Sequence, residues 1–354
     1  MSWHPPVPSV GYDDAGHPWQ VRRAWPSLSA GDYTLELGLP GRRGVRAAFY
    51  RQGQIEMLAP ADDARLPALA DASLHGEVLV HRAGKRAVVQ SDGQFIKIFR
   101  RSLLNDAAER HSLMAGILSG GDFVTPTLLS RSSGSLTFTS VPGRSLFELG
   151  QDPTLTDQQF ERLWKKWSRG WVDQYSEQLV PLRTGLPSHS SAVELESLRR
   201  IADLWLLHSA EVPAAAAQRL VLRAQLDQVG GLLLSGTPDR TVWSHGDLHD
   251  KQILVVDADA PLGLIDFDEA SEAEVAQDLA NLAVHLELRL RQKRLSRQRF
   301  LAARRQVVAA ALELQVSPAR FHAYSEATRL RLGCLYAFRP SWAALAQGLI
   351  GTPL

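Results

Sequence analysis

Residues 241–268, TVWSHGDLHDKQILVVDADAPLGLIDFD, interrupt an otherwise helical stretch with a strand, a polar loop and a second strand. The apolar runs ILVV and LGLI are short and flanked by turn residues, which favours two strands that pair antiparallel. That pairing brings the loop at 245–252 beside residues 266–268. Two carboxylates and one amide, from Asp247, Asp266 and Gln252, then converge.

The chain on either side of this segment changes its periodicity. Between residues 32 and 100, runs of β-branched and aromatic residues alternate with Gly-containing turns, which predicts strands. From residue 155 the apolar spacing becomes helical and predicts helices at 155–180, 191–209, 212–235, 275–293, 296–315 and 318–348. Residues 1–20 predict an irregular arm. The fold class is therefore α+β, with a β-rich N-terminal lobe and a mainly helical C-terminal lobe.

Composition narrows the function classes. The 354 residues carry 39 Lys plus Arg and 38 Asp plus Glu, so no strong field favours nucleic acid or an anionic membrane. Cys334 is the single cysteine, which excludes an intramolecular disulfide and zinc sites built on several thiolates. No secretory signal or apolar span is seen, so we expect a cytoplasmic protein without a membrane or nucleic-acid partner.

The spacing of the polar residues in the hairpin matches phosphoryl-transfer chemistry. Gln252 follows Asp247 by five positions and Asp266 follows it by nineteen. Transfer of a phosphoryl group to a hydroxyl needs one aspartate to accept the hydroxyl proton and an amide and a second aspartate to hold Mg²⁺. Two protein ligands are sufficient because Mg²⁺ fills its sphere with water and phosphate.

The N-terminal lobe offers the remaining parts of such a site. Lys97, in the predicted strand QFIKIFR, is a candidate contact for the nucleotide phosphates. Glu109, twelve residues later on a predicted helix, is the candidate partner of that lysine. The turn HRAGKRAVV supplies Gly84 and Arg86 as candidate phosphate-covering residues, although it lacks the full multi-glycine loop.

These motifs, with QDLANLAVHL after them, resemble the aminoglycoside phosphotransferase and choline kinase superfamily, which has a protein-kinase-like fold. The resemblance covers about residues 76–150 and 240–290. It implies ATP and Mg²⁺ as cofactors and a small-molecule hydroxyl as acceptor. It also implies three regions: a β-rich cap with the N-terminal arm at 1–75, a nucleotide-binding lobe at 76–143, and a helical lobe at 144–354 that contains the catalytic hairpin.

The resemblance also implies residue roles. Asp247 corresponds to the base, Gln252 and Asp266 to the Mg²⁺ ligands, and Lys97 to the nucleotide contact. Asp278 matches an aspartate that supports the catalytic loop. One departure is plain, because the family usually has Pro-Gly-Asn where this chain has Asp-Lys-Gln at 250–252. Glutamine keeps the amide oxygen and is similar to the maltokinase and glucosamine-kinase branch.

Several neighbours have more than one interpretation. His245 is expected to brace the loop, whereas His249 either does the same or faces the acceptor. Asp268 is either a second metal contact or a solvated neighbour. The nine tryptophans are interpreted mainly as core residues, with Trp342 as a candidate wall of the acceptor pocket.

The acceptor is expected to be a sugar, an amino sugar or an aminoglycoside-like compound, with the glutamine variant favouring a neutral or amino sugar. Three carboxylates, at Glu269, Glu272 and Glu274, either line an acidic pocket or form a solvated helix start. Two other functions stay open. A kinase fold without turnover would follow if Gln252 fails as a ligand. A metallophosphoesterase would need further histidine clusters, which the sequence lacks.

Overall fold

The first sheet of the protein is built by the N-terminal residues. The computed structural model describes residues 4–176, 184–257 and 259–349. Five antiparallel strands lie in chain order: β1 (Val10–Tyr12), β2 (Pro18–Pro26), β3 (Tyr33–Gly38), β4 (Val45–Arg51) and β5 (Gln54–Met57). We call this the cap sheet. The prediction of an irregular arm over residues 1–20 was wrong in part, because β1 and the start of β2 pair with each other there.

A second five-stranded sheet forms the rest of the β-rich lobe. Its spatial order is β10-β11-β8-β7-β6. Its strands are β6 (Glu77–Arg82), β7 (Arg86–Ser91), β8 (Gln94–Phe99), β10 (Leu128–Arg131) and β11 (Ser135–Thr139). Helix α1 (Ala68–Leu74) precedes this sheet, and α2 (Arg101–Ile117) follows β8 and packs against it. Lys97 on β8 therefore has a paired strand on either side, opposite Val88 and Leu136.

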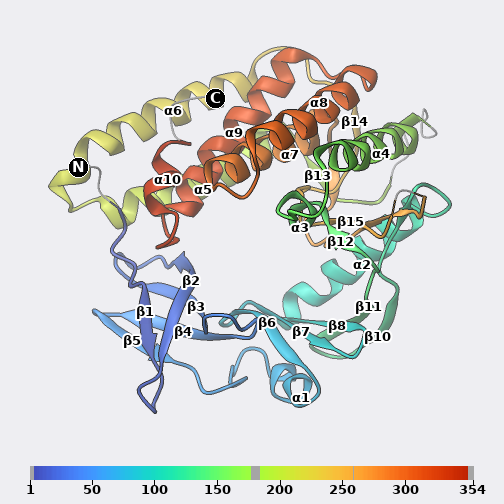
Figure 1. Ribbon diagram of the computed structural model, residues 1–354. Coiled ribbons are helices and arrows are strands. Elements are labelled where there is room, and N and C mark those ends of the chain that lie inside the picture. The colour runs from blue at the N-terminus through green and yellow to red at the C-terminus, as the bar shows by residue number, and fades with distance from the viewer. Residues whose placement is uncertain (1–3, 177–183, 258, 350–354) are drawn as a thin grey trace.

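The C-terminal part is mainly helical and lies above the two sheets in Figure 1. Its helices are α3 (Leu146–Gly150), α4 (Asp157–Ser176), α5 (Ser191–Ser209), η1 (Pro213–Ala215), α6 (Ala216–Leu234), α7 (Ala276–Arg291), α8 (Arg297–Glu313), α9 (Pro318–Tyr336) and α10 (Ala343–Gln347). The helix expected over 318–348 is broken between α9 and α10 at a turn beside Pro340, a residue that cannot donate a backbone hydrogen bond. The α+β, two-lobed fold class is confirmed.

Two small sheets are set among these helices. One has the order β12-β15-β16-β9, with β9 (Phe123–Val124), β12 (Arg144–Ser145), β15 (Ile253–Val255) and β16 (Leu262–Leu264). The other has the order β13-β17-β14, with β13 (Ser188–His189), β14 (Thr241–Ser244) and β17 (Ser271–Glu274). The strand before the polar loop thus pairs outside the hairpin, which is formed by β15 and β16 alone.

Tryptophans fill the core between α4 and the small sheets. Trp164, Trp167 and Trp171 recur on one face of α4 and are almost completely buried. Trp171 meets Trp243 of β14 with ring centroids 5.3 Å apart, in an edge-to-face arrangement. The interpretation of the tryptophans as core residues is confirmed for these four.

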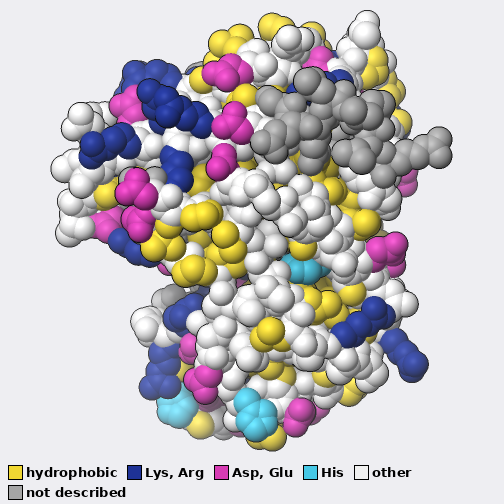
Figure 2. Space-filling model, turned by 90° about the vertical axis from the view of Figure 1, so that its right-hand side faces the viewer, with side chains coloured by type: hydrophobic (Ala, Val, Ile, Leu, Met, Phe, Trp, Pro, Cys, Tyr) yellow, Lys and Arg dark blue, Asp and Glu magenta, His cyan; other side chains and the backbone are white. Residues whose placement is uncertain are grey.

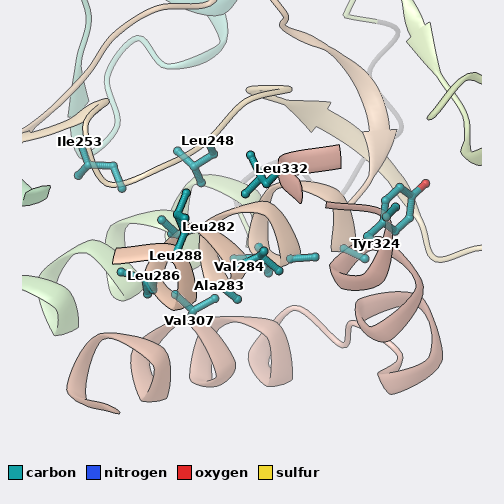
Figure 3. Close-up of a cluster of buried hydrophobic side chains, with 14 of the residues drawn as sticks. Leu248, Ile253, Leu282, Ala283, Val284, Leu286, Leu288, Val307, Tyr324 and Leu332 are labelled. Carbon is teal, nitrogen blue, oxygen red and sulfur yellow. The ribbon is translucent and has the colours of Figure 1, made fainter. Parts of the chain in front are cut away.

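The polar loop is anchored on α7 by its apolar residues. Leu248 and Ile253 are fully buried and lie against the cluster that includes Leu282 and Leu288 of α7 (Figure 3). Apolar contact on both sides of the loop fixes where its polar side chains emerge, because buried side chains in a dense core have little freedom to shift.

Charges of both signs are interspersed on the face shown in Figure 2, in keeping with the near-balanced total. Within the part of the chain that the structure describes, every helix is too short or too polar to span a membrane.

Leu248→Ala should lower the free energy of unfolding by about 2–5 kcal/mol, because it removes buried methyl groups and leaves a cavity under the loop. Urea denaturation followed by tryptophan fluorescence measures this change. Leu220→Ala is the matched control, because Leu220 is 71% exposed and should change stability by less than about 0.5 kcal/mol. Equal effects of the two substitutions would contradict the anchoring role.

Candidate active site

The two ends of the hairpin meet as the sequence predicted. β15 and β16 are antiparallel, with Ile253 opposite Leu264. The Gln252 carbonyl accepts a hydrogen bond from the Ile265 N–H at 3.2 Å. The antiparallel pairing of the two apolar runs is therefore confirmed, and it places Gln252 beside the residue that precedes Asp266.

The start of the polar loop is held by a buried carboxylate on α7. Asp278 accepts the backbone N–H of His245 at 2.6 Å and that of Gly246 at 3.0 Å. Burial raises the pKa of Asp278, and the nearby His245 and these hydrogen bonds oppose that rise. The buried His245 ring lies 2.9 Å, at Nε2, from the Ile265 carbonyl oxygen, so it joins the loop to the far end of the hairpin.

Asp247 extends from this loop into a mixed environment. Its carboxylate is 39% exposed and lies 4.0 Å from the Arg331 guanidinium of α9. Asn281 Nδ2 lies 3.5 Å from Asp247 Oδ1 and donates to the Leu248 carbonyl at 2.9 Å. Burial raises the pKa of Asp247, while Arg331 lowers it in part. A carboxylate with a raised pKa is a better proton acceptor than an ordinary aspartate.

Gln252 is buried and helps to close the loop. Its side-chain Oε1 accepts the His249 N–H at 3.0 Å, which leaves further acceptor capacity on the same oxygen. The His249 ring lies against that of His285 in a tilted arrangement, with ring centroids 4.7 Å apart, and its Nε2 lies 4.0 Å from Asp247. Burial and then Arg289 hold the pKa of His249 well below its ordinary value, so the ring is neutral at pH 7.

Lys97 lies between two aspartates at the other side of the cleft. Its Nζ is 2.5 Å from Asp266 and 2.7 Å from Asp268. Burial raises the pKa of Asp266, but Lys97 and then Arg86 outweigh this and bring it below its ordinary value. Asp266 also has a φ of +74°, a left-handed conformation that costs a non-glycine residue about 1–2 kcal/mol. Such local strain is concentrated at functional sites.

The expected pairing of Glu109 with Lys97 is not formed. Glu109 lies on the exposed face of α2 and has no ion pair within the described part of the chain. Asp268 takes that place instead, because it binds Lys97 and also Arg86 at 3.0 Å. Asp268 is only 17% exposed, which excludes its interpretation as a solvated neighbour. Asp106 and Arg110 of α2 line the site, and Arg110 donates to the Asp268 carbonyl at 2.5 Å.

The turn between β6 and β7 is closed by the Lys85 N–H, which donates to the Arg82 carbonyl at 3.0 Å, and is braced by the Asp63 carboxylate. Gly84 has a φ of +64°, and its N–H donates to Asp63 at 2.7 Å. Asp63 also bonds the buried ring of His81 at 3.1 Å. The turn presents three cations to the cleft, from Arg82, Lys85 and Arg86.

Two cavities meet at Asp266 and Asp268. The first, the catalytic cleft, has a volume of about 460 Å³ and contains Asp247, Gln252, Asp266 and Asp268 with the cations of the Gly84 turn and Arg110. The second, the apolar pocket, has a volume of about 430 Å³. Its walls are mainly apolar, including Val88, Phe138 and Leu254, and Lys97 lines it beside Asp266 and Asp268. The site thus joins an apolar compartment to a charged one.

The oxygen donors of the catalytic cleft fit a hard divalent cation. Two carboxylates, Asp266 and Asp268, and the Gln252 amide line the same cavity. Oxygen ligands from a few side chains, completed by water and phosphate, are what Mg²⁺ takes in phosphoryl-transfer sites. Within the described residues, no three His, Cys, Asp or Glu side chains converge as a metal site by themselves.

Two acidic residues considered for the site lie elsewhere. Glu272 and Glu274 belong to strand β17 and not to a helix start, because their backbone pairs with β14. Glu274 forms a buried ion pair with Arg320 at 2.6 Å, and Glu272 accepts the Thr184 hydroxyl at 2.7 Å. Only Glu269 of the three carboxylates lines the catalytic cleft.

Three contacts were missed from the sequence. Asn281 follows Asp278 by three positions on α7, and this spacing on one helix face was a usable signal. Arg110 sits one residue after Glu109, on the side of α2 that faces the cleft. Arg331 comes from α9, more than eighty positions after Asp247, and no local pattern points to it.

Comparison with known proteins identifies the family and the fold of the chain. A family model described as the phosphotransferase enzyme family matches residues 136–314, just over half of the chain. The structure of the GDP complex of wild-type aminoglycoside 2′-phosphotransferase-IIIa is similar, with a TM-score of 0.51, 17% identity, and coverage of 78% of this chain and 90% of that chain.

Two other solved structures are similar to the same degree. The GDP and kanamycin complex of APH(2″)-IIia has a TM-score of 0.51, 17% identity, and coverage of 77% of this chain and 90% of that chain. Aminoglycoside phosphotransferase APH(3″)-Id from Streptomyces rimosus has a TM-score of 0.50, 16% identity, and coverage of 72% and 92%. At these identities the likeness shows the shared fold. No curated protein sequence matches the chain.

Gly246→Ala should destabilise the protein more than Gly93→Ala. Both glycines have positive φ, +80° and +71°, which costs a new side chain about 1 kcal/mol. A Cβ at Gly246 would also lie 2.0 Å from the Glu269 carbonyl oxygen, whereas nothing lies within 4 Å of one at Gly93. Urea denaturation of both variants measures the difference, and equal losses would contradict the close approach at Gly246.

Proposed function

Since this chain belongs to the phosphotransferase enzyme family and is a kinase of small molecules, we propose that it moves the γ-phosphate of ATP to a hydroxyl group in the catalytic cleft. The observation that carries the proposal is the convergence of Asp247, Gln252, Asp266 and Lys97 from two lobes. This fit replaces the metallophosphoesterase hypothesis, whose histidine clusters are not found among the described residues.

Asp247 is the proposed base. Its partly exposed carboxylate faces the cleft, with Asn281 and Arg331 fixing its position. The acceptor hydroxyl gives its proton to Asp247 as its oxygen forms a bond to the γ-phosphorus, and the bond from that phosphorus to the bridging oxygen of ADP breaks. The raised pKa of Asp247 supports this role, because it brings the proton affinity of the carboxylate closer to that of the acceptor hydroxyl.

The nucleotide is proposed to occupy the apolar pocket with its base and the catalytic cleft with its phosphates. Apolar walls of about 430 Å³ suit a planar purine ring. Lys97 lies where the two cavities join, and Arg86 and the Gly84 turn lie along the charged one. Phosphate oxygens would compete with Asp266 and Asp268 for Lys97, which frees these carboxylates for other partners.

Gln252 and Asp266 are the proposed Mg²⁺ ligands. Bound Mg²⁺ would neutralise charge on the transferred phosphate. The Gln252 oxygen keeps a lone pair beyond its bond to His249, and Asp266 opens onto the same cleft. His245, His249 and Asp278 are proposed to support this loop through the hydrogen bonds described above.

The acceptor is proposed to be a sugar, an amino sugar or an aminoglycoside-like compound. Structures with the same fold include one bound to kanamycin. Glu269 is one extra carboxylate in the catalytic cleft, where burial raises its pKa.

We further propose that the chain divides into three regions, at residues 1–75, 76–143 and 144–354, and that the protein is cytoplasmic.

Asp247→Ala should lower kcat by about 10²–10⁴-fold, because a general base contributes that much to the rate. ATP should still bind, because Asp247 is not proposed to contact the adenine ring or the ribose. Nucleotide consumption with a panel of acceptors and calorimetric titration of ATP measure the two effects. Asp259→Ala removes the same charge from an exposed site and should leave both unchanged. Wild-type kcat in Asp247→Ala would exclude this base.

Gln252→Ala should raise the Mg²⁺ concentration needed for half-maximal turnover by about 10-fold or more, because a ligand oxygen is lost. Gln252→Asn keeps an amide, so its Mg²⁺ requirement should lie between those of the wild type and Gln252→Ala. Titration with Mn²⁺ followed by electron paramagnetic resonance gives metal binding without turnover. If ATP binding is independent of the metal in the wild-type protein, and no acceptor is turned over, the alternative of a nucleotide-binding module holds.

A further inference from the structure

A third cavity lies between the cap sheet and the helical lobe. We call it the cap cleft. It adjoins the apolar pocket, since Leu79 of β6 lines both. It has a volume of about 370 Å³, and its other lining residues come mainly from β2, β3, α3, α7, the end of α9 and the turn that follows. Lys251 faces it, whereas the next residue, Gln252, faces the catalytic cleft. The catalytic loop is therefore the wall between the two cavities.

The cap cleft is lined by six cationic side chains and one carboxylate. The cations are Arg22, Arg23, Lys251, Arg289, Arg294 and Arg339, and the carboxylate is Glu36. Glu36 pairs with Arg23 at 3.3 Å, and the buried Asp250 behind the wall pairs with Arg289 at 3.0 Å. The other four cations have no carboxylate partner within the residues that the structure describes.

Lys251 and Arg339 are two of these four cations, and both lie over aromatic rings that line the cavity. The Lys251 ammonium lies 4.5 Å from the centre of the Phe147 ring, and the Arg339 guanidinium lies 3.8 Å from that of Tyr336. Like charges kept together in a confined space repel each other, and a bound anion would relieve that repulsion.

The rest of the lining suits the carbon skeleton of a small molecule. Phe147, Tyr336 and Trp342 add aromatic surface to the cavity. A cavity of about 370 Å³ is within the range of small-molecule sites. Aromatic faces beside guanidinium groups are a usual combination for compounds that carry both a ring and a phosphate or carboxylate.

We propose that the cap cleft binds the phosphate or carboxylate group of a small molecule, held by Lys251 and Arg339 and packed against Trp342. The anionic group has two possible sources. It belongs either to the acceptor itself, an interpretation that rests on the proposed function, or to a separate anion bound next to the catalytic loop.

Calorimetric titration of the full-length protein with inorganic phosphate tests the site without turnover. Saturating ADP keeps the cations of the catalytic cleft occupied. The double substitution Lys251→Gln and Arg339→Gln should weaken phosphate binding by about 10- to 100-fold, because charged hydrogen bonds are lost. Arg199→Gln, at an exposed position on α5, removes one charge elsewhere and should bind as the wild type does.

Loss of repulsion should leave the double variant folded, which a thermal melt verifies. Unchanged phosphate affinity in the double variant, or no binding by the wild type, would overturn the proposal. Neither result would affect the proposed function, since transfer to a neutral acceptor would be measured separately.

Paired acceptors distinguish the two sources. A hexose, its 6-phosphate and its uronic acid are compared by kcat/KM in the wild type and in Arg339→Gln. If the anion belongs to the acceptor, the charged compounds are preferred by about 10-fold or more and the preference is lost in the variant. If the anion is separate, added phosphate changes KM for the neutral hexose in the wild type alone. Either result supports the site.

Discussion

The active site depends on the contact between Asp278 and the backbone of the polar loop. One carboxylate accepts the N–H groups of His245 and Gly246, and it comes from the first turn of a helix that is buried along almost its whole length. Because α7 is fixed by its packing in the core, its contacts with the loop also fix the position of the loop. Asn281, one helical turn later, donates its side-chain amide to the Leu248 carbonyl. Two side chains of one helix thus determine where Asp247 and Gln252 emerge.

Charge is balanced differently on the two sides of that loop. Where the catalytic cleft meets the apolar pocket, Lys97 and Arg86 pair with Asp266 and Asp268, and each of these two cations has a carboxylate at 3.0 Å or less. In the cap cleft, Lys251 and Arg339 have none among the described residues. A compensated cluster can exchange partners when a phosphate arrives, since each new bond replaces an old one. A cluster of cations without carboxylate partners is stabilised by any bound anion. The two cavities therefore differ in the chemistry of the ligands that suit them.

Local patterns predicted the hairpin, the strand that carries Lys97 and the placing of Asp247 and Gln252 on one polar loop. Each of these features is encoded within a few residues of sequence. Contacts across the fold were not accessible in that way. Glu109 was chosen from helix position alone, but the rotation of α2 turns Arg110 toward the site and Glu109 toward solvent. Glu272 and Glu274 lie shortly before a predicted helix, which favoured a solvated helix start. Their backbone pairs with β13 and β14, and long-range pairing of this kind overrides local preference.

The cap sheet is joined both to the helical lobe and to the second sheet of its own lobe, which gives its position a mechanical consequence. Toward the helical lobe, the His208 ring accepts the Gly31 N–H at 3.2 Å and donates to the Ser27 carbonyl at 3.0 Å. Toward the other sheet, Glu36 accepts the His81 N–H at 3.1 Å. If the two lobes move relative to each other when ligands bind between them, one of these two interfaces must change with them. Glu36 also pairs with Arg23 in the cap cleft, so a change at the β-sheet interface would alter the charge that the cleft presents to an anion.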